Sequence, residues 1–188
     1  MGNRYDQLLT LIDLITPKTI IEVGTWNGEN AIRMINAARK HTHDVTYIGY
    51  DLFELATAET DKEEFNVKPH NKIKDVQRKL EENCAGAVIT LIGGNTRESL
   101  RNKIRGDLVF VDGGHSLETI KNDYEAVSDS SVIVLDDYYS PDSAGSISDT
   151  ALYGCNALIS TMDHAIILPK KDKVSGGGLV QFAMVLNK

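Results

Sequence analysis

Acidic residues and glycines recur along this chain in short polar segments, each of which follows an apolar run. The segments read Glu22-Val-Gly24-Thr25-Trp26-Asn27-Gly28, then Asp51-Leu52, Gly94-Asn95, Asp112-Gly-Gly-His115 and Asp136-Asp137. Carboxylates accept charge-assisted hydrogen bonds, and glycine turns let a ligand approach the backbone closely. Five such segments brought together would form one acidic ligand-binding rim.

The apolar runs that precede these segments have the lengths of buried strands. They cover residues 19–24, 45–51, 88–92, 108–111 and 132–135, and segments of helical periodicity separate them. This alternation is typical of an α/β fold with a doubly wound, mostly parallel sheet. Ligands of such sheets bind at the carboxyl ends of the strands, so we expect the polar segments to share one edge.

The two ends of the chain complete a single predicted domain, 1–188. Apolar residues at helical spacing predict a leading helix within residues 1–16, which Pro17 ends. Strands at 165–168 and 179–186 are separated by too few residues for a helical crossover, so a C-terminal antiparallel hairpin is expected in a seven-stranded sheet. Residues 52–71 and 138–150 are irregular, and we interpret them as substrate flaps; a helix bearing Leu152, Leu158 and Ile159 follows.

Composition narrows the class of partner. Hydrophobic residues make up 41% of the chain and charged residues 25%, with a formal charge of −7 and no dense basic stripe, so no nucleic-acid partner is expected. Cys84 and Cys155 stand in unrelated contexts, which predicts neither a disulfide nor a zinc site. No signal peptide or membrane-spanning run is present, so we expect a cytoplasmic protein without a membrane partner. A homo-oligomer is left open.

The first polar loop argues against a dinucleotide. A pyrophosphate site requires a small residue where Trp26 stands, and acids at Glu22, Asp51 and Asp112 suit a cation better than a phosphate. A sulfonium donor with an ammonium group and a ribose diol, such as S-adenosylmethionine, fits these charges. Asp51 is placed to accept both ribose hydroxyls, and Leu52-Phe53 to cover the adenine.

Taken in order, the five segments resemble the class I methyltransferases. More narrowly, they are similar to the small-molecule O-methyltransferases related to the macrocin and catechol enzymes, over roughly residues 18–140. Trp26 departs from this pattern, because many members carry a second glycine there. The N-terminus also departs, with one short helix where catechol-type enzymes carry more.

The resemblance implies roles for individual residues. It implies donor binding by the following set: Glu22, Gly24, Thr25, Trp26, Asn27, Gly28, Asp51, Leu52, Asn95 and Asp112. In the resembled metal-dependent enzymes, acids at the positions of Asp112, Asp136 and Asp137 hold a divalent cation such as magnesium, manganese or calcium. His115 falls where those enzymes place a general base, so His115 and Asp112 are the expected catalytic residues for O-methylation of a small hydroxylated acceptor, such as a sugar or a phenol.

Other interpretations stay open from the residues alone. Asn95 could cap the helix that follows it, Asp136 and Asp137 could cap a loop or bind a substrate hydroxyl, and His115 could simply begin the next helix. A methyltransferase without a metal, using His115 alone as base, is the second hypothesis. A donor-binding module without catalysis is the third.

Overall fold

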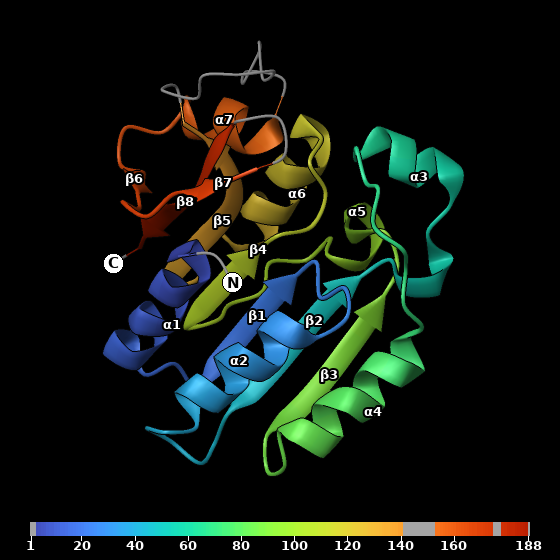
Figure 1. Ribbon diagram of the computed structural model, residues 1–188, viewed down its shortest axis with the longest axis vertical. Coiled ribbons are helices and arrows are strands. Elements are labelled where there is room, and N and C mark those ends of the chain that lie inside the picture. Colours follow the sequence, from blue (N-terminus) through green and yellow to red (C-terminus); the bar gives the residue numbers. More distant parts are fainter. Residues whose placement is uncertain (1–2, 141–152, 175–177, 188) are drawn as a thin grey trace.

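The computed structural model describes residues 3–140, 153–174 and 178–187, which form one central sheet with helices on both faces (Figure 1). The first half of the chain contains α1 (Asn3–Ile15), β1 (Thr19–Val23), α2 (Glu29–Ala38), β2 (Thr46–Asp51), the 3₁₀ helix η1 (Phe53–Leu55), α3 (Ala58–Glu63), α4 (Ile73–Asn83) and β3 (Val88–Gly93). The second half contains α5 (Thr96–Ser99), β4 (Leu108–Val111), α6 (Leu117–Val127), β5 (Val132–Tyr139), α7 (Gly154–Ile159), β6 (Ile166–Ile167), β7 (Asp172–Lys173) and β8 (Leu179–Leu186).

The predicted doubly wound sheet is confirmed. Its strand order is β3-β2-β1-β4-β5-β8-β6, with β7 paired to β8. The pairs from β3 to β5 are parallel, whereas β8 runs antiparallel to β5 and β6, as expected of the C-terminal hairpin. The chain reverses its winding between β1 and β4, and ligands of doubly wound sheets bind at the carboxyl ends of the strands beside such a reversal.

Alternate residues of each central strand serve two separate cores. Ile20 and Phe110 pack on the side of α1, α2 and α4, whereas Ile21 and Val111 pack on the side of α6 and α7. Successive side chains of a strand point to opposite faces, so a sheet covered on both faces needs continuous apolar runs. This requirement explains why the strands could be recognised as runs rather than as alternating patterns.

Several predicted boundaries need correction. Residues 52–71 are only partly irregular, because they contain η1 and α3, and Thr57 caps α3 reciprocally with Thr60. Residues 138–139 belong to β5 rather than to a flap, and 141–150 lie outside the described residues, as does Leu152. Both cysteines, Cys84 and Cys155, are buried and free.

No helix in the described ranges combines the length and apolarity needed to cross a bilayer.

Candidate functional site

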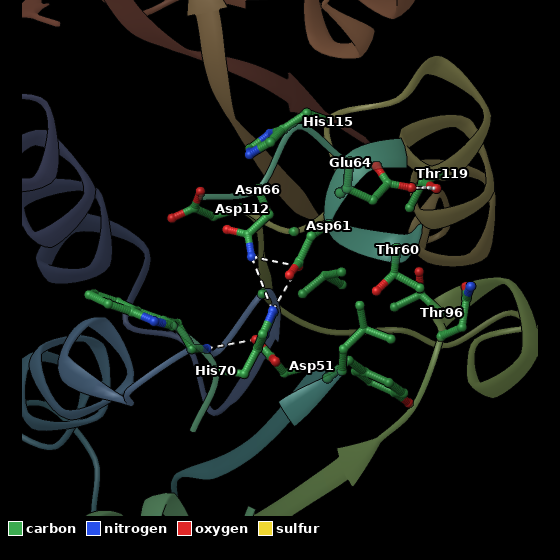
Figure 2. Close-up of a pocket in the computed structure, with 18 of the residues that line it drawn as sticks. Asp51, Thr60, Asp61, Glu64, Asn66, His70, Thr96, Asp112, His115 and Thr119 are labelled. Atoms are coloured by element: carbon green, nitrogen blue, oxygen red, sulfur yellow. Dashed lines mark hydrogen bonds and ion pairs between the residues drawn. The ribbon is translucent and has the colours of Figure 1, made fainter. Parts of the chain in front are cut away.

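A pocket of about 880 Å³ opens to solvent at the carboxyl ends of the parallel strands, as the sheet topology predicts. Seven of the predicted site residues line it: Gly24, Trp26, Asp51, Leu52, Asn95, Asp112 and His115. Figure 2 shows Asp51 at the end of β2, on the opposite side of the pocket from Asp112 and His115. The sequence therefore located the pocket correctly from strand ends alone.

The loop after β1 approaches the loop after β4 very closely. Gly24 has a φ of +94°, and a Cβ atom at this position would lie 2.0 Å from the carbonyl oxygen of Asp112. Only glycine tolerates both the backbone angle and this contact. Gly24 therefore sets the distance between the two loops that form this part of the pocket.

Four residues predicted to bind the donor do not line the pocket. Glu22 is buried under the loop, where its carboxylate accepts a hydrogen bond from the Tyr47 hydroxyl. Burial raises the pKa of Glu22 to about 8. The Thr25 side chain is also buried and pairs with the same hydroxyl at 3.2 Å. Both residues stabilise the interior of the loop instead of facing a ligand.

Asn27 and Gly28, the other two, start helix α2. The Asn27 side-chain oxygen accepts a hydrogen bond from the Glu29 amide at 3.0 Å. Gly28 caps the helix with a φ of +76°, and a Cβ there would lie 3.1 Å from both Val76 and Leu80. Gly28 therefore allows α2 to pack closely against α4. A glycine in the sequence pattern alone does not tell whether it is needed for helix packing or for contact with a ligand.

The Asp51 carboxylate is oriented by the backbone around it. Its Oδ2 accepts a hydrogen bond from the Trp26 amide at 2.8 Å, and its Oδ1 accepts one from the Phe53 amide at 2.7 Å. Each carboxylate oxygen can accept a second bond, so both remain able to bind a hydroxyl. Leu52 lines the pocket as expected, but Phe53 is buried in the core and cannot cover a ligand there.

Asn95 follows β3 and caps the next helix, which is one of the two roles that the sequence left open for it. Its side-chain oxygen accepts a hydrogen bond from the Arg97 amide at 3.0 Å and so caps α5. Asn95 also lines the pocket. The helix cap fixes its position beside the ligand space, and the two interpretations are compatible.

A second, much narrower pocket adjoins the first. Asp112, Gly113, Gly114 and His115 line both pockets, and Asp136, Asp137 and Tyr153 line only the second. A group bound in one space would therefore meet a group bound in the other beside His115. The shared wall therefore places His115 at the boundary between the two pockets.

His115 is held by a residue in a strained conformation. Its Nδ1 lies 3.2 Å from Asp137 Oδ2. Asp136 and Asp137 form a β-bulge in β5, where the register with β8 shifts between Leu135 and Tyr138, and Asp137 has a φ of +57°. Bulges turn side chains away from the regular strand direction, and this one aims the Asp137 carboxylate at the imidazole.

The three carboxylates expected to hold a metal do not form such a site. Asp136 Oδ2 instead lies 3.1 Å from Arg4 Nη2 and accepts a hydrogen bond from the Tyr5 hydroxyl at 3.0 Å. No group of three or more His, Cys, Asp or Glu side chains in the part of the chain described here is arranged to hold a metal ion. The predicted set Asp112, Asp136 and Asp137 therefore does not fit a divalent cation in this arrangement.

Burial and mutual repulsion still affect these carboxyl groups. Burial, followed by the charge of Asp137, raises the pKa of Asp112 to about 7. Burial also raises the pKa of Asp136 well above its usual range, and the charges of Asp112 and Asp137 add to this effect. Arg4 opposes the shift at both residues.

Sequence reasoning missed the segment that covers the larger pocket. The Glu64 carboxylate accepts hydrogen bonds from the Ser116 amide at 2.9 Å and from the Thr119 hydroxyl. His70 Nε2 lies 2.7 Å from Asp61 Oδ1, and both residues line the pocket (Figure 2). No local pattern marks these partners, because they lie on elements far apart in the sequence.

Comparison with known proteins identifies the fold and the family. The model of the methyltransferase domain family matches residues 21–138, more than half of the 188 residues, and the match includes all five polar segments. This chain belongs to the methyltransferase domain family. No curated protein sequence matches this methyltransferase.

Solved structures confirm the expected class I methyltransferase fold. The O-methyltransferase TomG from Streptomyces achromogenes, in complex with SAM, has a TM-score of 0.61 at 16% identity, covering 98% of this chain and 79% of that one. An O-methyltransferase from Bacillus cereus, in complex with SAH, has a TM-score of 0.64 at 15% identity, covering 100% and 82%. Spermidine synthase from Thermotoga maritima has a TM-score of 0.57 at 15% identity, and the alignment covers 98% of this chain and 59% of that one. The same architecture therefore also occurs in a protein with a different named activity.

Proposed function

We propose that this methyltransferase transfers the methyl group of S-adenosylmethionine to a hydroxyl group of a small acceptor, with His115 as general base. The observation that carries the proposal is the shared wall of the two pockets, where His115 lines both the larger pocket and the narrow one beside it. The donor belongs in the larger pocket, and the acceptor hydroxyl belongs beside it at the shared wall, next to His115.

The residues of the larger pocket suit the donor. S-adenosylmethionine supplies an electrophilic methyl group on a sulfonium sulfur when it is bound. Asp51 would accept the ribose hydroxyls through the free lone pairs of its two oxygens, and the Asp112 carboxyl would lie on the side of the positive charge. Gly24 allows the backbone to approach the ligand.

His115 and Asp137 provide the proton-transfer step. When His115 donates from Nδ1 to Asp137, its Nε2 carries a free lone pair that can take the proton of an acceptor hydroxyl. The acceptor oxygen then bonds to the methyl carbon as the carbon–sulfur bond breaks, and the bonding electron pair stays on sulfur. Asp137 stabilises the imidazolium that forms.

Two comparisons test this proposal. Purified protein should methylate members of a panel of sugars and phenols when a donor with a labelled methyl group is supplied. EDTA should leave this activity unchanged, whereas strong inhibition that Mg²⁺ reverses would support the metal-assisted reaction that the resemblance implies. Donor binding without transfer to any acceptor would favour the non-catalytic donor-binding module.

A further inference from the structure

The first turn of α1 reaches into the carboxylate cluster at the ends of β4 and β5. Arg4 is largely buried, with 12% of its side chain exposed, and its Nη2 lies 3.1 Å from Asp136 Oδ2. Its other nitrogens lie 3.9 Å from Asp137 Oδ1 and 3.7 Å from Asp172 Oδ2. Figure 1 shows the N-terminal end of α1 close to β4 and β7, in agreement with these contacts.

Tyr5 joins the same cluster from the next position of α1. Its hydroxyl donates to Asp136 Oδ2 at 3.0 Å and lies 3.5 Å from Asp112 Oδ2. Its ring packs edge-on against Phe182, with the centroids 5.4 Å apart. Tyr5 therefore fixes the helix turn that carries Arg4.

The surroundings of the guanidinium are those of a cation site. Its carbon lies 5.0 Å from the centroid of the Tyr5 ring and 5.6 Å from that of Phe182, so two aromatic faces accompany the acids. A guanidinium stays charged at every physiological pH. Carboxylates gathered at strand ends repel one another unless a cation offsets their charge.

We propose that the Arg4 guanidinium is the resident cation of the Asp112, Asp136 and Asp137 cluster and takes the place of the divalent ion that the resemblance implies. The chain then needs no metal to hold Asp136 and Asp137 in place. This inference concerns the site of the proposed function, but its test measures metal binding and uses no donor or acceptor. Its failure is therefore distinguishable from failure of the methyl-transfer proposal.

The test is a Mn²⁺ titration, followed by electron paramagnetic resonance, of the wild type and of Arg4→Met. Wild type should bind Mn²⁺ no better than an Asp136→Asn variant does. Arg4→Met should bind one Mn²⁺ at least about tenfold more tightly, equivalent to at least about 1.4 kcal/mol, because the acids are then without their cation. Adding Asp136→Asn to Arg4→Met should abolish this gain.

Two further variants sharpen the result. Arg33→Met removes an arginine whose Nη2 contacts Asp6, 3.3 Å away, and it should leave Mn²⁺ binding unchanged. Arg4→Gln keeps the polar tip without the charge and provides a second route to the gain if Arg4→Met does not fold. Tight Mn²⁺ binding by wild type that Asp136→Asn removes would overturn the proposal. A folded Arg4 variant that gains no Mn²⁺ binding would overturn it equally.

Discussion

Carboxyl groups that look alike in the sequence occupy different environments in this site. Asp51 keeps free lone pairs toward the larger pocket, whereas Glu22 is enclosed beneath the loop with Tyr47 as its partner. Oε1 of Glu22 is buried without a hydrogen-bond partner. Position at a strand end therefore does not tell whether an acid faces the ligand or the interior.

Glu22→Gln should change how stability depends on pH. The pKa of Glu22 is raised from 4.5 to about 8 by burial, so the folded state keeps a proton that the unfolded chain has lost. Stability of the wild type should therefore fall as the pH rises from about 4.5 through about 8. The neutral amide should remove this contribution and stabilise the protein on the order of 4–5 kcal/mol at about pH 9, because each pKa unit between 4.5 and about 8 corresponds to about 1.4 kcal/mol.

Urea unfolding at about pH 5 and about pH 9 measures this difference. Glu125→Gln alters an exposed glutamate and should leave the pH profile of the wild type unchanged. Identical profiles for Glu22→Gln and wild type would show that Glu22 is ionised in the folded protein.

His115→Ala tests the proposed base. Loss of general-base catalysis should lower kcat by roughly 10²–10⁴-fold, while donor affinity stays nearly constant. His164→Ala, at an exposed position, is the matched control. A nearly normal kcat with a raised KM for the acceptor would assign His115 to substrate positioning instead.

Among the elements, α3 and the residues after it are the least expected part of the fold. Glu64 attaches α3 to the N-terminus of α6, and the Trp26 indole donates to the Pro69 carbonyl at 2.9 Å. Asn66 and Lys68, between these contacts, line the larger pocket together with Asp61 of α3. The segment therefore covers the larger pocket and is held at both ends.

Glu64→Ala should loosen this cover without unfolding the protein. Donor binding must then order the segment, and we expect it to weaken by roughly 3–10-fold, equivalent to about 1 kcal/mol. Amides of residues 58–66 should exchange their hydrogens faster in the absence of donor. Glu59→Ala, at an exposed position of the same helix, should change neither quantity; equal effects of the two variants would contradict the proposed attachment.

Elements that bury apolar side chains could be predicted from the sequence, whereas elements that bury none could not. The predicted strand at 108–111 coincides with β4, because a strand buried on both faces needs a continuous apolar run. The charged segment 58–63 gave no such signal, since α3 buries none of its residues and depends on its Thr57 cap. The bulge at Asp136 depends on pairing with β8, which no local pattern records.

At the scale of the molecule, the sheet topology made the position of the larger pocket predictable. Parallel strands end at one edge, so residues 24, 51, 95 and 112 had to meet there. Arg4 and Tyr5 escaped prediction because they come to this edge on a helix, and Tyr5 is separated from Asp136 by 131 positions. Packing of α1 against α2 and Phe182 brings them there, a tertiary effect outside the reach of sequence periodicity.

The central claim is that the larger pocket binds S-adenosylmethionine, and calorimetric titration tests it most directly. Wild type should bind S-adenosylmethionine and its demethylated product with micromolar affinity and should not bind NAD. Asp51→Ala should weaken donor binding by about 1–3 kcal/mol, through loss of two charge-assisted bonds to the ribose, whereas Asp75→Ala on α4 should not. Binding of NAD without either methionine derivative, or equal donor affinity in Asp51→Ala and wild type, would contradict the claim.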